Sequence, residues 1–129
     1  MALEIGQKFR CDMVVTEKDV AAMAESNSFN VLATPRMIML MEESCSFSLL
    51  PHLDEGYASV GIHIDVYHTA ATPLGKKVWA ESELTEIDGR KVTFKVTAYD
   101  EDGEIGFGTH ERFIINVERF IKKHEESHK

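Results

Sequence analysis

Residues 34–50 read TPRMIMLMEESCSFSLL, and this stretch decides the fold. Thr34 is a good helix cap, and Pro35 loses nothing at a first helical position by lacking an N–H. The pair predicts a helix from about Pro35 to Leu50. Its five consecutive apolar residues, 37–41, cannot share one face about 100° wide. We therefore expect a central helix that other elements cover on most sides.

Alternation of apolar and polar residues predicts strands before and after this helix. One strand covers residues 8–15, and Thr16 with Asp19 then opens a short helix. Four strands follow the central helix, at about residues 59–67, 78–88, 92–98 and 105–117. The first of these should carry one apolar face, formed by Val60, Ile62, Ile64 and Val66. In the last, Gly106 and Gly108 predict a bulge or a close backbone contact.

The connections between the later strands are short enough for hairpins, and Asp88-Gly89 favours a tight turn. Consecutive hairpins imply antiparallel pairing. The expected class is α+β, with a curved antiparallel sheet around the central helix. The 129 residues fit one domain, 1–129, with a tail from Glu118 that is helical or frayed.

Composition excludes several classes of protein. The chain has 14 Lys and Arg against 22 Asp and Glu, a net charge of −8, which argues against nucleic-acid binding. The N-terminus does not resemble a signal peptide, and the apolar runs of the sequence are too short for a membrane span. Cys11 and Cys45 are expected to be reduced, in the cytoplasm. Its six histidines lack metal-site spacing and its glycines form no phosphate-binding loop, so we expect no metal and no cofactor.

Glu42 and Thr34 are ambiguous when taken alone. A buried Glu42 would have a raised pKa, useful for proton transfer, but it could equally lie on a solvent-facing edge of the helix. Helix capping is sufficient to explain Thr34.

His68 ends a strand beside a small-residue loop, where an imidazole can act as a base, although a structural role is the more common one. His63, five residues earlier, should point to the opposite face. Arg112 could anchor a carboxylate or phosphate, although pairing across the sheet is favoured.

Three stretches resemble the fluoroacetyl-CoA thioesterase family of hotdog-fold proteins. They are residues 33–42, then YHTAATPLG at 67–75, then EIGFGTHER at 104–112. The resemblance covers nearly the whole chain, and HTAATP together with GTHER makes it specific. It implies the hotdog fold, an acyl-CoA substrate, and homodimers whose two sites lie between the subunits.

The resemblance also implies a catalytic set carried by Thr34, Glu42 and His68. The backbone at Gly61 would lie by the acyl carbonyl, and Arg112 would help to hold the site. We expect Glu42 to attack the thioester or activate water, with Thr34 orienting that carboxylate. His68 would position or deprotonate the water and protonate the leaving thiolate, while an N–H near Gly61 stabilises the oxyanion.

Two alternatives from other classes keep the same fold. One is a non-catalytic acyl-CoA-binding or sensing domain, and the other is a hydroxyacyl-thioester dehydratase. The retained Thr34, Glu42 and His68 favour hydrolysis over both. Fold alone would not decide this ranking, because one fold hosts many chemistries.

The segment before Thr34 departs from the family pattern. The fluoroacetyl-selective member has a lid rich in phenylalanine and proline, whereas residues 26–30 here read SNSFN. We therefore expect a short acyl-CoA substrate rather than fluoroacetyl selectivity. A phosphate-binding patch for CoA would be drawn from basic residues of the second half of the chain. These residues are Lys76, Lys77, Arg90, Lys91, Arg119, Lys122 and Lys123.

Overall fold

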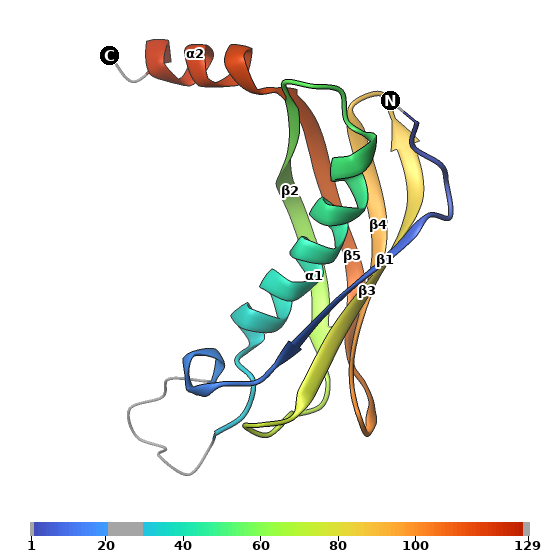
Figure 1. The fold of residues 1–129 in the computed structure, drawn as a ribbon, viewed down its shortest axis with the longest axis vertical. Helices are drawn as coiled ribbons and strands as arrows, with labels where there is room; N and C mark the ends of the chain where they lie inside the picture. Colours follow the sequence, from blue (N-terminus) through green and yellow to red (C-terminus); the bar gives the residue numbers. More distant parts are fainter. Residues whose placement is uncertain (1, 21–29, 128–129) are drawn as a thin grey trace.

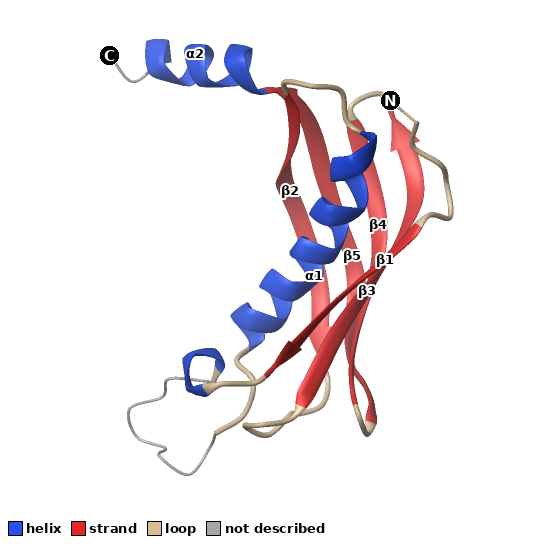
Figure 2. Cartoon of the chain, viewed as in Figure 1, coloured by secondary structure: helices blue, strands red, loops and turns tan. Residues whose placement is uncertain are grey.

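One face of an antiparallel sheet carries the long helix α1 in the computed structural model (Figure 1, Figure 2), which describes residues 2–20 and 30–127. The helices are α1 (Thr34–Leu49) and α2 (Val117–Ser127), with short 3-10 turns η1 (Glu17–Asp19) and η2 (Leu50–His52). The strands are β1 (Lys8–Val14), β2 (Tyr57–His68), β3 (Lys77–Asp88), β4 (Lys91–Asp100) and β5 (Gly103–Asn116). All but one of the predicted helices and strands are present. The exception is the short helix after Thr16, where the described part is a single 3-10 turn and residues 21–29 lie outside the described range.

The five strands form one sheet in the order β1-β3-β4-β5-β2, and every neighbouring pair is antiparallel. The α+β class predicted from the hairpin-length turns is therefore confirmed. β1 and β2 are the edge strands, so β2 pairs only with β5 among the described residues. An unpaired strand edge exposes backbone groups that can pair with another chain.

The sheet covers only one side of α1, so the prediction of a helix covered on most sides is wrong for the single chain. Met37, Leu40 and Met41 are buried against the sheet. On the open side, Met39 is 52% exposed and Phe47 is 43% exposed. The apolar run thus supplies both a core face and an apolar face that this chain leaves open.

A bulge at Ile62 overturns the prediction of one apolar face on β2. Gly61 pairs with Arg112 and His63 with Glu111, so Ile62 has no opposite residue in β5. One extra residue reverses the alternation. Val60 therefore lies opposite Phe113 on the face away from α1, while Ile64 lies opposite His110 on the face towards α1.

The close backbone contact predicted for the glycines of the last strand is confirmed. A Cβ on Gly106 would lie 2.6 Å from Met37 Sδ, and one on Gly108 would overlap the carbonyl oxygen of Asp65. These two positions let β5 approach α1 and β2 closely. Among the described residues, no helix combines the length and apolarity that crossing a membrane requires.

Candidate active site

The first pair of predicted site residues joins the start of α1 to the end of β2. Thr34 Oγ1 lies 2.7 Å from His68 Nδ1, a hydrogen bond between residues 34 apart in sequence. Ala33, not Thr34, is the N-cap of α1, and the helix has no side-chain cap hydrogen bond. The capping role predicted for Thr34 is therefore wrong, because its hydroxyl binds the imidazole instead.

The surroundings of His68 favour a neutral ring. Burial lowers the pKa of His68, and the backbone of Ala70 acts in the opposite direction. Its Nε2 is buried and has no hydrogen-bond partner among the described residues. The residue His68 also lines a hollow of about 300 Å³, together with residues 31–34 and 69–71. A neutral imidazole with an unpartnered nitrogen can exchange a proton with a bound molecule.

The second group gathers around Glu42 in the middle of α1. Glu42 Oε2 lies 3.8 Å from Arg112 Nη1, and the Glu42 side chain is 41% exposed. A Cβ placed on Gly61 would lie only 3.0 Å from the same carboxylate oxygen. Glu42 is thus neither in the core nor on a free edge, and it borders a hollow of about 240 Å³ with Gly61 and the residues around the bulge.

Arg112 reaches this group from β5 and is held by β2. Its Nε donates to Ser59 Oγ at 2.8 Å, and its Nη2 donates to the Ser59 carbonyl at 2.9 Å. The favoured prediction, pairing across the sheet, is confirmed, and the partner is Ser59 on β2. Burial lowers the pKa of Arg112, and a guanidinium stays protonated even so.

His110 belongs to the same group, and reasoning from the sequence missed it. It is 1% exposed, its Nδ1 lies 2.7 Å from the carbonyl oxygen of His63, and its Nε2 lies 3.2 Å from Arg112 Nη1. The spacing of GTHER contained the signal, because residues two apart on a strand share a face.

The predicted site residues form two groups within one chain, not one. Thr34 and Glu42 are eight residues apart on α1, about 12 Å along the helix. Gly61 and His68 are seven residues apart on β2, about 20 Å once the bulge is allowed for. Thr34 therefore does not orient the carboxylate of its own chain.

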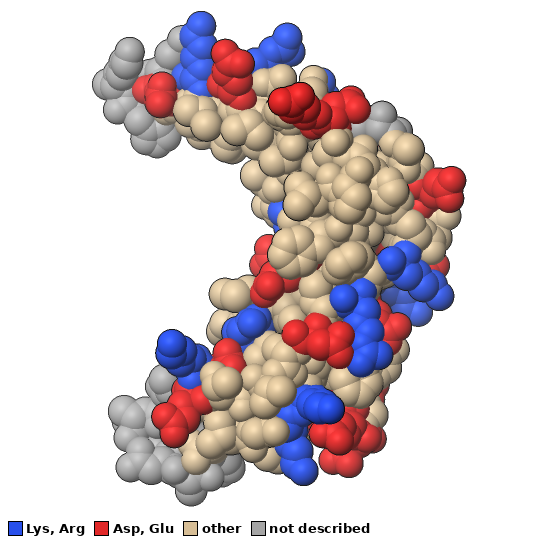
Figure 3. Space-filling view, in the orientation of Figure 1, with Lys and Arg blue, Asp and Glu red and all other residues tan. Residues whose placement is uncertain are grey.

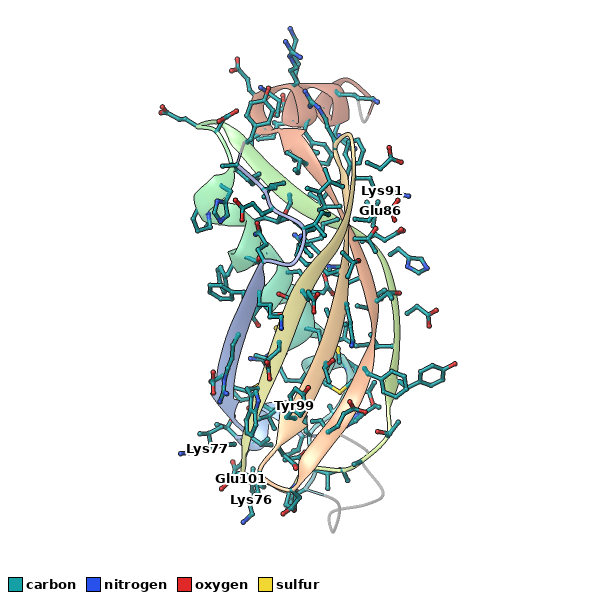
Figure 4. All side chains as sticks on the ribbon, turned by 90° about the vertical axis from the view of Figure 1, so that its right-hand side faces the viewer. Lys76, Lys77, Glu86, Lys91, Tyr99 and Glu101 are labelled. Atoms are coloured by element: carbon teal, nitrogen blue, oxygen red, sulfur yellow. The ribbon has the colours of Figure 1, made fainter. Side chains whose placement is uncertain are left out.

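The basic residues from which a phosphate-binding patch would be drawn are spread over both ends of the sheet and α2 (Figure 4). Lys76 and Lys77 lie at one end of the sheet and Lys91 at the other (Figure 4). Arg119, Lys122 and Lys123 lie on α2, beyond the end of β5. Among residues 2–20 and 30–127, no three His, Cys, Asp or Glu side chains gather as a metal site would require.

Comparison with known proteins gives consistent matches. The family model for fluoroacetyl-CoA-specific thioesterases matches residues 15–118. The fluoroacetyl-CoA thioesterase of Streptantibioticus cattleyicolor is 41% identical over 127 residues, which cover 94% of this chain and 91% of that protein. The solved structure of the fluoroacetyl-CoA thioesterase FlK has a TM-score of 0.87 at 38% identity and covers 98% of both chains.

A more distant structure shows the fold. The hot-dog-like protein of Thermanaerovibrio acidaminovorans has a TM-score of 0.87 at 23% identity, over 95% of this chain and 91% of its own. The predicted hotdog fold, with an antiparallel sheet and a long helix packed on it, is confirmed; the sheet lies on one side of the helix rather than around it.

Proposed function

Because the chain belongs to the fluoroacetyl-CoA-specific thioesterase family, we propose that it hydrolyses a short acyl-CoA to the free acid and CoA. Family membership supports the reaction class. The two groups of polar residues around Thr34 and Glu42 support the site. The acyl chain of the substrate is proposed to be short. The SNSFN segment, which distinguishes this protein from the fluoroacetyl-selective relative, falls almost entirely in residues 21–29, outside the described range.

In the proposed reaction, the Glu42 carboxylate attacks the thioester carbonyl directly or through a water molecule. The backbone N–H near Gly61 stabilises the oxyanion, because the missing side chain lets the carbonyl approach. In the direct route the C–S bond breaks as an acyl–Glu42 anhydride forms, His68 then takes a proton from the water that opens the anhydride, and that proton ends on the thiolate. In the water-mediated route Glu42 activates the water, and His68 takes the proton of that water and donates it to the thiolate as the C–S bond breaks. Both routes yield a carboxylic acid and a thiol. Thr34 keeps the imidazole in place through the 2.7 Å hydrogen bond.

The observation that carries the architecture of the site is the separation of its two halves. An interval of about 20 Å between Gly61 and His68 is too long for both to act on one carbonyl. We infer that the working unit is a homodimer in which His68 and Thr34 of one copy meet Glu42, Gly61 and Arg112 of the other.

The free edge of β2 is the proposed contact between the copies. An antiparallel pairing of two β2 edges, centred on Asp65, sets His68 opposite the partner's Ile62 at the bulge, beside the partner's Gly61. The open face of α1, with Met39 52% exposed, would be covered in the same assembly. The space-filling view is hollowed on the side of the molecule where β2 has its free edge (Figure 3).

The test is thiol release from acetyl-, fluoroacetyl-, propionyl- and benzoyl-CoA by the wild type, Glu42→Gln and His68→Ala. If the wild type hydrolyses an ester and both substitutions abolish this activity, the proposal is supported. Unchanged turnover in both variants rejects the residue assignment. Saturable binding without thiol release would indicate a sensing domain. An enoyl product without free CoA would indicate a dehydratase. The proposed location is the cytoplasm, where Cys11 and Cys45 stay free thiols.

A further inference from the structure

His110 is the buried titratable group that the proposed mechanism leaves without a role. Its Nδ1 lies 2.7 Å from the backbone carbonyl oxygen of His63. A carbonyl oxygen only accepts hydrogen bonds, so Nδ1 must carry the hydrogen. In the neutral ring, Nε2 is then left as an acceptor.

That acceptor faces a donor. Arg112 Nη1 lies 3.2 Å from His110 Nε2, and every guanidinium nitrogen of Arg112 donates. The other two nitrogens, Nε and Nη2, are already held by Ser59 at 2.8 and 2.9 Å. The neutral imidazole therefore fixes the third corner of the guanidinium.

The same Nη1 is the atom of Arg112 nearest the carboxylate, 3.8 Å from Glu42 Oε2. We propose that His110 is a positioning residue: as a neutral ring anchored to the His63 carbonyl, it aims Arg112 Nη1 at the Glu42 carboxylate. The effect of His110 on kcat rests on the proposed hydrolysis, whereas the Nδ1–H tautomer of His110 can be tested without it.

The bulge of β2 explains the anchor. β2 has one residue more than β5 between the Gly61–Arg112 and His63–Glu111 pairs. Bulges of this kind redirect local backbone groups and recur beside active sites. Here the carbonyl of His63 accepts from a side chain on the neighbouring strand, and Gly61, at the start of the bulge, leaves room for the ring. A Cβ on Gly61 would lie 3.2 Å from His110 Cε1.

Protonation of His110 would break the arrangement, because Nε2–H would then face the N–H of Arg112. The charged groups facing the ring are Arg112 on β5 and Glu42 on α1, while the side chain of His63 on β2 acts on the ring from the opposite face of the sheet. Burial lowers the pKa of His110 most strongly, Arg112 and His63 lower it further, and the hydrogen bond to His63 and the charge of Glu42 raise it. The ring is neutral at neutral pH and gains its proton on acidification.

Two substitutions separate positioning from packing. In His110→Asn the amide can still donate to the His63 carbonyl but leaves Arg112 Nη1 without its acceptor. In His110→Gln the longer amide can place an oxygen where Nε2 was. We expect kcat of the Asn variant to fall about 10- to 100-fold with KM within about threefold, because misplaced groups cost that much. The Gln variant should recover most of the loss.

The pH profile gives a readout that packing would not move. The acid limb of kcat should shift to lower pH in His110→Gln, since His110 no longer takes up a proton there, while the control His52→Gln keeps the wild-type profile. Nitrogen-15 spectra of labelled histidine should show His110 as the Nδ1–H tautomer at neutral pH, whether or not a CoA ester is hydrolysed. Wild-type kcat in His110→Asn, equal losses in both variants, or the Nε2–H tautomer would each overturn the proposal. If wild-type protein hydrolyses no ester yet shows the Nδ1–H tautomer, the proposed function fails while this geometry stands.

Discussion

Gly61→Ala is the substitution whose effect the structure defines most closely. The added Cβ would lie 3.0 Å from Glu42 Oε2, 3.2 Å from His110 Cε1 and 3.4 Å from Arg112 Nη1. The imidazole and the guanidinium are fixed by hydrogen bonds, whereas the carboxylate is the end of a flexible side chain. We expect the carboxylate to be displaced and the hollow beside it to narrow.

The substitution should affect stability and the rate of hydrolysis differently. Replacing a strand glycine by alanine contributes about 0.5–1 kcal/mol of stability, so the crowding should leave the free energy of unfolding within about 1 kcal/mol of wild type. Moving a reacting group by about 1 Å costs about 100-fold in rate, which is about 2.7 kcal/mol of transition-state stabilisation. Gly61→Ala should therefore lose activity while its free energy of unfolding stays close to that of the wild type.

The assay is steady-state thiol release from the best CoA ester, alongside urea unfolding of the same samples. Val60→Ile is the control, because it adds one methyl to the same strand on the face away from α1. A Gly61→Ala protein with kcat/KM within about threefold of wild type would refute the placement of the carbonyl beside Gly61. A variant whose activity falls only in proportion to its lost stability would refute it too.

Three other predictions concern the second half of the site and the fold. Thr34→Ala should lower kcat about 10- to 100-fold while Thr34→Ser retains most activity. Melting temperatures should differ little, because Thr34 makes no cap bond and the hydrogen bond to His68 that the Ala variant loses is exposed to solvent; equal kcat in the two variants would count against the role. Burial lowers the pKa values of His68 and His110, so the unfolded chain binds more protons. The free energy of unfolding should then fall as pH drops below about 6.5, and urea titrations showing no fall would contradict this. Gly108→Ala should cost at least about 2 kcal/mol in urea unfolding, because its Cβ would overlap the Asp65 carbonyl; a cost below about 0.5 kcal/mol would show that β5 is not packed this closely.

The sequence predicted the elements well because local rules govern them. Thr34-Pro35 marked the start of α1 to within one residue, and alternation located all five strands. The odd spacing of His63 and His68 correctly placed them on opposite faces, because no bulge falls between them.

What failed depended on contacts distant in sequence. The bulge at Ile62 is a local insertion with no signature beyond the neighbouring Gly61, and it moved Val60 to the other face of the sheet. The hydroxyl of Thr34 was expected to cap its own helix, but its partner is 34 residues away. The open face of α1 could not be foreseen either, because apolar residues alone do not say whether one chain or two will cover them.

The central claim is that each active site takes Thr34 and His68 from one copy and Glu42 from the other. Mixing inactive His68→Ala and Glu42→Gln proteins, after unfolding and refolding together, tests it directly. In a mixed dimer, one site would combine the intact His68 of one copy with the intact Glu42 of the other. Random pairing then predicts thiol release at about one quarter of the wild-type rate. If each site came from a single chain, every site in the mixture would carry a defect, and activity no higher than the sum of the two separate variants would contradict the account.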